Sequence, residues 1–185
     1  MIEKKYINLV ADMVSNDDIA PIYTLEKKHN WICYFGETNP ADILEELVSH
    51  LLNEHISNMV MITYTSMDDI KVYELDNISY ELVFESYFMN QDKFETFCQY
   101  TILTTRDIDF ICFKDSGDAC FSLCGKYSLV QNSFSGLTYE KMMANFIQYF
   151  REFSISPLKE DSNDYWVKFL KVYDDFNKKQ VEHSS

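Results

Sequence analysis

The sequence is poor in glycine, proline and arginine, and it has no long apolar run. Its 185 residues include four glycines and three prolines. The glycines are scattered, so no glycine-rich loop is present to cradle a phosphate group. No stretch approaches the roughly eighteen consecutive apolar residues of a membrane-spanning helix. These absences argue against a nucleotide-binding protein and against a membrane-embedded one.

Basic residues are also scarce. Thirty acidic residues against sixteen basic ones give a formal net charge of −14, and only Arg106 and Arg151 are arginines. Lys and Arg normally supply most of the affinity for phosphates, so this balance disfavours direct binding to nucleic acid or to an anionic membrane. A strongly negative field favours solubility and fast encounter with a basic partner. The N-terminal residues carry charges before any signal-peptide core could form, and we expect a cytoplasmic protein.

Cysteine and histidine spacings predict no metal or cofactor site. The odd number of cysteines and their apolar surroundings are typical of reduced core residues; they are Cys33, Cys98, Cys112, Cys120 and Cys124. In a strand rising about 3.3 Å per residue, Cys120 and Cys124 lie roughly 13 Å apart, too far for one zinc ion or a disulfide. His50 and His55 point about 140° apart on a helix, so they are no zinc pair.

Length and composition predict one globular domain over residues 1–185, with residues 180–185 as a loose tail. The hydrophobic fraction is 46%, with 14 Phe and 13 Tyr, which is ample apolar area to offset the entropy of ordering the chain. Hydrophobic periodicity predicts helices over 3–14, 40–56, 90–102, 138–153 and 162–179. Strands are predicted over 22–25 and 31–35, as a hairpin, and over 59–65 and 70–75, joined by a turn at Ser66-Met67-Asp68-Asp69. Residues 78–89 fit a strand or a helix, and we interpret them as a strand.

The stretch from 108 to 130, IDFICFKDSGDACFSLCGKYSLV, predicts the centre of a sheet. The residues up to Phe113 show the period-two pattern of a strand, in which Ile108, Phe110 and Cys112 share one face. Asp115-Ser116-Gly117-Asp118 then has the composition of a four-residue hairpin loop. This loop would pair Cys112 with Phe121. Gly125-Lys126 would form a second tight turn before a third strand over 127–130.

Both faces of this predicted meander are apolar. A sheet with two apolar faces needs cover on both sides. We therefore expect a layered α/β (α+β) single domain, in which helices pack on the faces of a central, mostly antiparallel sheet.

Paired acidic residues are the remaining candidates for chemistry. They are Asp68 with Asp69, Asp115 with Asp118, Asp107 with Asp109, and Glu81 with Glu85. Such pairs can stabilise turns, contact a partner, bind a cation or serve as acid and base. The Asp115–Asp118 loop supplies two carboxylates, fewer than a calcium loop requires.

The acidic, Tyr- and Phe-rich chain, with FICFKDSGDACFSLCGKYSLV followed by TYEKMMANFIQYF, resembles immunity proteins of contact-dependent growth inhibition and related polymorphic toxin systems in bacteria. The resemblance implies a toxin inhibitor without catalytic activity, which blocks a cognate toxin domain, often a basic nuclease, by protein–protein interaction. It predicts no particular oligomeric state. The candidate partner-binding residues are Asp115, Asp118, Asp68, Asp69, Glu81, Glu85, Tyr87 and Tyr127. The alternatives are a small cytosolic enzyme that uses a carboxylate pair or a cysteine, and a regulatory protein-binding module.

Overall fold

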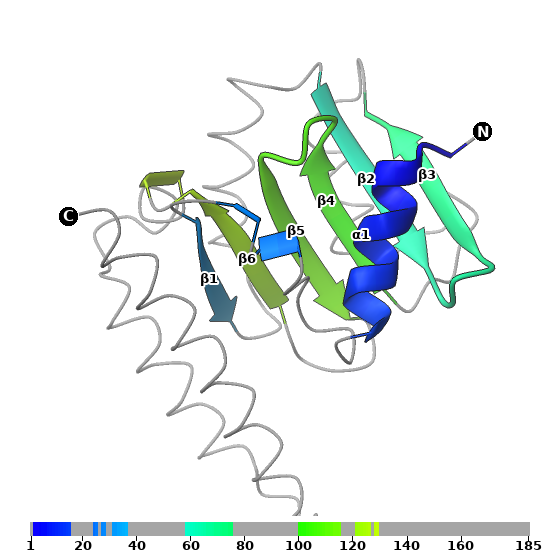
Figure 1. The fold of residues 1–185 in the computed structure, drawn as a ribbon, viewed down its shortest axis with the longest axis horizontal. Coiled ribbons are helices and arrows are strands. Elements are labelled where there is room, and N and C mark those ends of the chain that lie inside the picture. The colour runs from blue at the N-terminus through cyan, green and yellow to red at the C-terminus, as the bar shows by residue number, and fades with distance from the viewer. Residues whose placement is uncertain are drawn as a thin grey trace, which may run out of the picture.

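An antiparallel sheet of six strands organises the part of the chain that the structure describes. The computed structural model describes residues 2–15, 24–25, 27–28, 31–36, 58–75, 100–115, 121–126 and 128–129. The strands are β1 (Trp31–Gly36), β2 (Met59–Tyr64), β3 (Ile70–Glu74), β4 (Tyr100–Thr105), β5 (Phe110–Asp115) and β6 (Phe121–Lys126). Their order across the sheet is β1-β6-β5-β4-β2-β3 (Figure 1). The fold is α+β, as the sequence predicts.

Helix α1 (Lys4–Ser15) lies across one face of the sheet (Figure 1). Its apolar residues recur at helical spacing, so Tyr6, Leu9, Val10 and Met13 form one buried stripe. This stripe packs with sheet residues such as Ile62 in a single hydrophobic core. The predicted helix over 3–14 is confirmed.

Both faces of the sheet are buried, as the two apolar faces of the strands predict. Ile111 and Phe113 belong to the core that contains α1. Residues one step along the strand point to the opposite face, and Phe110 and Cys112 are fully buried there, together with Leu103. Near-continuous apolar strands such as β5 are therefore explained by burial on two sides rather than one.

Strands β2 and β3 form the hairpin that the sequence predicts over 59–65 and 70–75. Val60 pairs with Glu74, and Tyr64 pairs with Ile70. All of β2 is buried, whereas every residue of β3 is exposed or half-buried. This difference follows from their positions, because β2 is paired on both sides and β3 is the last strand of the sheet.

Strand β4 corrects the end of the predicted helix over 90–102, of which residues 90–99 lie outside the described residues. Tyr100–Thr105 is extended and pairs with β2 on one side and with β5 on the other. The run TILTT is rich in β-branched residues, which favour strands. The helical spacing of Thr101 and Ile102 with earlier residues was misleading, because two ladders of backbone hydrogen bonds outweigh a short periodic match.

The predicted meander is confirmed for its first two strands and wrong in its register and its third strand. Cys112 pairs with Leu123 rather than with Phe121. This shift of two residues leaves every side chain on its predicted face. Gly125-Lys126 lies inside β6 rather than in a turn, and Ser128 and Leu129 are helical.

The partner of β6 on its other side is β1, which comes from the N-terminal part of the chain. This pairing also corrects the predicted hairpin between 22–25 and 31–35. Thr24 and Leu25 are helical, and the N–H of Lys28 donates a hydrogen bond to the Leu25 carbonyl over 2.9 Å. The predicted elements over 40–56, 78–89, 138–153 and 162–179, and the tail, lie outside the described residues.

Candidate functional site

Strand pairing brings Asp115 to the same end of the sheet as the predicted Asp68–Asp69 pair. Asp115 pairs with Tyr100, Tyr100 with Tyr64, and Tyr64 with Ile70, so these residues form one row across four strands. Asp68 and Asp69 lie in the turn between Tyr64 and Ile70. Neighbouring strands are about 4.8 Å apart, which places the backbone of Asp115 roughly 10 Å from the start of this turn. We call Asp68, Asp69 and Asp115 the acidic end of the sheet.

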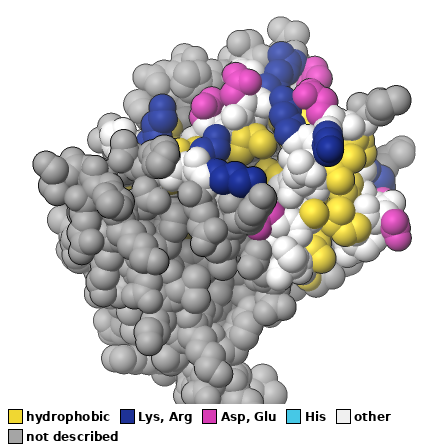
Figure 2. Space-filling view, in the orientation of Figure 1, with side chains coloured by type: hydrophobic (Ala, Val, Ile, Leu, Met, Phe, Trp, Pro, Cys, Tyr) yellow, Lys and Arg dark blue, Asp and Glu magenta, His cyan; other side chains and the backbone are white. Residues whose placement is uncertain are grey.

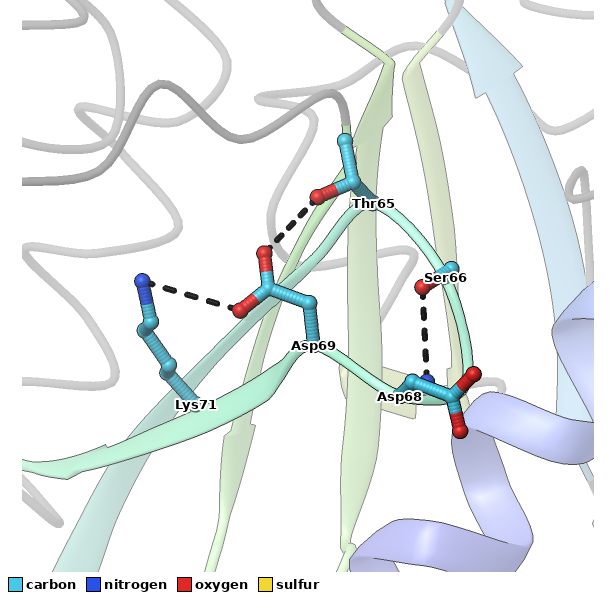
Figure 3. Close-up of polar contacts among 5 residues, drawn as sticks. All are labelled: Thr65, Ser66, Asp68, Asp69 and Lys71. Atoms are coloured by element: carbon cyan, nitrogen blue, oxygen red, sulfur yellow. Dashed lines mark hydrogen bonds and ion pairs between the residues drawn. The ribbon is translucent and has the colours of Figure 1, made fainter.

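Asp69 is held by its neighbours within the β2–β3 turn (Figure 3). The Thr65 hydroxyl donates a hydrogen bond to Asp69 Oδ2 over 2.9 Å, and Lys71 Nζ lies 3.7 Å from Asp69 Oδ1. The Asp69 N–H donates to the Ser66 carbonyl over 3.1 Å. These contacts are typical of an aspartate that stabilises a turn. Since both oxygens have partners, Asp69 mainly fixes the shape of the turn.

Asp68 differs from Asp69 in having an uncommitted carboxylate. Its backbone N–H donates to the Ser66 hydroxyl over 3.3 Å, while its carboxylate points away from Asp69 (Figure 3). The side chain is exposed, and no described residue forms an ion pair or hydrogen bond with its oxygens. Asp68 is therefore presented to solvent on a turn that its neighbours make rigid.

Three aromatic side chains, which we call the aromatic ladder, lie next to the acidic end: Tyr64, Tyr100 and Phe113. The Tyr64 and Tyr100 rings stack with centroids 5.1 Å apart, and the Tyr100 and Phe113 rings stack at 6.0 Å. Tyr64 and Phe113 are buried, whereas Tyr100 is partly exposed. Stacked aromatic pairs on adjacent strands stabilise a sheet beyond their burial. The sequence pattern missed this ladder because it placed Tyr100 in a helix.

The opposite end of the sheet combines both signs of charge. Arg106 Nη2 lies 2.7 Å from Glu74 Oε2. Lys28 Nζ donates to the Ile108 carbonyl over 3.0 Å and lies 5.0 Å from the centroid of the Trp31 ring. Figure 2, in the same orientation as Figure 1, shows lysine or arginine and acidic side chains near one another, among hydrophobic ones, on the described surface. At this end, cationic and acidic side chains therefore lie close together.

The β4–β5 turn, at the same end as Arg106, holds a residue in an unfavourable conformation. Ile108 has φ of 54°, a left-handed value that is costly for a β-branched side chain. Its N–H donates to the Thr105 carbonyl over 3.0 Å. The Thr105 hydroxyl accepts from the Asp109 N–H over 3.0 Å and donates to Asp109 Oδ2 over 2.9 Å. These bonds keep the turn closed and assign Asp109 a turn-forming role.

A buried carboxylate on α1 also escaped the sequence pattern. Asp12 is buried, and its Oδ2 accepts a hydrogen bond from the Thr24 N–H over 2.6 Å. In the sequence, Asp12 lies three residues after Leu9 and one before Met13, at the border of the apolar stripe. This position was the signal that could have indicated a buried carboxylate. Asp12 therefore joins α1 to the short helical segment at Thr24 and Leu25.

The predicted partner-binding residues have separate outcomes. Asp68 and Asp69 lie in an exposed turn, as predicted. Asp115 is the last residue of β5 rather than a loop residue, because its backbone pairs with Tyr100. The remaining candidates lie outside the described residues: Asp118, Glu81, Glu85, Tyr87 and Tyr127.

Comparisons with known proteins give no family assignment: no family model, no curated protein and no solved structure matches the chain. Within the described ranges, no three metal-ligating side chains cluster closely enough to hold an ion. No helix in that part of the chain has the length and hydropathy needed to cross a membrane.

Proposed function

We propose that this chain is an immunity protein, which binds a cognate basic toxin domain through an acidic surface and neutralises it in the cytoplasm. The observation that carries the proposal is the rigid, exposed Asp68 turn within a chain of net charge −14. The Asp68 carboxylate has no described intramolecular partner, so it can pair with a Lys or Arg of another protein without first breaking a contact.

Charge complementarity supports the proposal in two ways. A chain with fourteen excess negative charges attracts a basic partner over distances near the Debye length, about 8 Å at physiological salt. Acidic residues that are fixed in space lose little conformational entropy on binding. The Asp68 turn, which Asp69 fixes from within, satisfies both conditions. A basic nuclease is the favoured toxin class, because such enzymes present cationic surfaces to phosphates.

The test is co-expression with the polypeptide encoded immediately upstream of this chain. We expect the two proteins to form a complex, and we expect co-expression to relieve growth inhibition by the upstream polypeptide. Association should slow as ionic strength rises, because salt screens exposed charges. If no complex forms and growth inhibition persists, the proposed function is wrong.

A matched pair of variants tests the position of the interface. Asp68→Asn removes one charge from the acidic end, whereas Asp107→Asn removes the same charge from an exposed position in the β4–β5 turn. An exposed ion pair contributes about 0.2–1 kcal/mol, so Asp68→Asn should slow association by up to about fivefold. Asp107→Asn should leave the rate nearly unchanged. Equal effects of the two variants, measured by stopped-flow fluorescence, would show that net charge alone matters.

A further inference from the structure

Two cysteines meet across the first and last strands of the described sheet. Cys33 in β1 pairs directly with Cys124 in β6. Their sulfur atoms lie 2.8 Å apart, and both side chains are fully buried. The sequence separates the two residues by 91 positions, so local spacing gave no signal for this contact.

The backbone already has the geometry that a disulfide requires. Residues directly opposite in an antiparallel pair have Cα atoms about 4.5 or 5.5 Å apart. Disulfides span Cα separations of about 4.4–6.8 Å, with an S–S bond near 2.05 Å. The sulfur atoms therefore need to approach from 2.8 Å to bonding distance while the strands keep their positions.

We propose that Cys33 and Cys124 form a redox-sensitive pair, which a small-molecule disulfide oxidises to a cross-strand disulfide that locks β1 onto β6. One cysteine thiolate attacks a sulfur of the small disulfide, which forms a mixed disulfide and releases one small thiolate. The second cysteine thiolate attacks the protein sulfur of that mixed disulfide and releases the other small thiolate. Two protein thiols thus lose two electrons and two protons, and one small disulfide becomes two thiols.

The third described cysteine cannot replace either member of the pair. Ile111 is the β5 partner of Cys124, and Cys112, one residue along β5, belongs to the opposite face of the sheet. Cys112 is paired with Leu103 and Leu123 across the neighbouring strands. It is therefore a suitable control for the loss of a buried cysteine.

The position of β1 determines how an oxidant reaches the pair. Burial, together with the neighbouring Cys124, raises the pKa of the Cys33 thiol well above its ordinary value, so the closed sheet protects the pair from attack. Among the described strands, β1 is at one end of the order and is paired with β6 alone. Local opening of an end strand exposes both sulfur atoms at lower cost than global unfolding. Oxidation should therefore accelerate at urea concentrations below the unfolding transition.

The experiment uses the full chain and oxidised glutathione as the probe. After incubation in native buffer and in mild urea, free thiols are alkylated and the protein is digested with trypsin. We expect peptide 29–71, in which Cys33 is the only cysteine, to be linked to peptide 115–126, which contains Cys120 and Cys124. The link should persist in Cys120→Ala and in Cys112→Ala and disappear in Cys124→Ala. Fragmentation of the wild-type peptide pair assigns the link even if one variant does not fold.

Two measurements report the formation of the Cys33–Cys124 disulfide. The oxidised protein should melt about 4–16 °C higher than the reduced protein, and dithiothreitol should reverse the shift. Amide hydrogen exchange should slow in β1 and stay unchanged in β3, the strand at the other end of the sheet. If the 33–124 link forms neither in native buffer nor in mild urea, or if the link runs through Cys120, the proposal is wrong.

Discussion

Replacing Thr105 by valine tests whether side-chain hydrogen bonds hold the β4–β5 turn closed. The Thr105 hydroxyl both accepts from the Asp109 backbone and donates to the Asp109 carboxylate. Thr105 is 1% exposed, and valine has nearly the same shape, so the substitution keeps the packing and removes both bonds. Ile108, between these residues, keeps its left-handed conformation at a cost of about 1–2 kcal/mol. The hydrogen bonds of Thr105 therefore hold the turn closed against this strain.

The magnitude follows from the two bonds. A net hydrogen bond contributes about 0.5–1.5 kcal/mol, and a buried donor left without a partner costs about 1–3 kcal/mol. The Asp109 carboxylate is exposed and can turn to water, which puts the total near the lower part of this range. We expect Thr105→Val to reduce the free energy of unfolding by about 2 kcal/mol. With an m-value of about 1–3 kcal/mol/M, the urea midpoint should fall by roughly 1 M.

The assay is urea unfolding followed by tryptophan fluorescence, to which the buried Trp31 contributes. Thr105→Ser is the matched control, because it keeps the hydroxyl and loses one methyl group, which costs about 0.8 kcal/mol. A double-mutant cycle with Asp109→Ala should give a coupling free energy of about 1 kcal/mol between the two side chains. If Thr105→Val unfolds at the wild-type midpoint while Thr105→Ser unfolds earlier, the hydroxyl has no role in closing the turn.

Two further predictions concern the packing around α1 and β1. Burial raises the pKa of Tyr6 above its ordinary value near 10, so folding favours the neutral phenol. Stability should therefore fall as the pH rises from about 10 through the raised pKa. Tyr6→Phe should flatten this part of the curve of urea midpoint against pH, and an unchanged slope would contradict the prediction. Lys28→Met keeps the side-chain stem but loses the bond to the Ile108 carbonyl and the contact with the Trp31 ring. It should lower the free energy of unfolding by about 1–2 kcal/mol, more than the exposed control Lys27→Met, and equal losses would count against these contacts.

The predictable parts of the fold are those in which local pattern and burial agree. Helix α1 and the β2–β3 hairpin lie close to their predicted limits, because each has a repeating apolar pattern with polar residues at its ends. The register between β5 and β6 was wrong by two residues. Side-chain alternation determines which face of the sheet a residue occupies, but a register shift of two residues leaves that face unchanged, so alternation cannot detect it. The register depends on where β5 ends and β6 begins, at Asp115 and Phe121, and the alternation does not show these limits.

Nonlocal pairing explains the other errors and the missed contacts. Gly125 looked like a turn residue, but β1 pairs with β6 through Gly125 and Ile32, and nothing near Gly125 in the sequence indicates that partner. The same pairing brings Cys33 to Cys124. In the candidate site, the Asp68-Asp69 turn was predictable from its own composition. The position of Asp115 at the same end of the sheet was not predictable, because it depends on three strand pairings.

The pairing of β1 with β6 also has a consequence for the order of events during synthesis. A ribosome adds about 5–20 residues per second, so the 91 positions between Cys33 and Cys124 correspond to roughly 5–18 s. During that interval β1 has been made and its partner strand has not. The Trp31-Ile32-Cys33 segment, which is buried in the finished sheet, must wait in the nascent chain with its backbone groups unpaired. During that interval β1 is a suitable site for chaperones that bind short apolar segments.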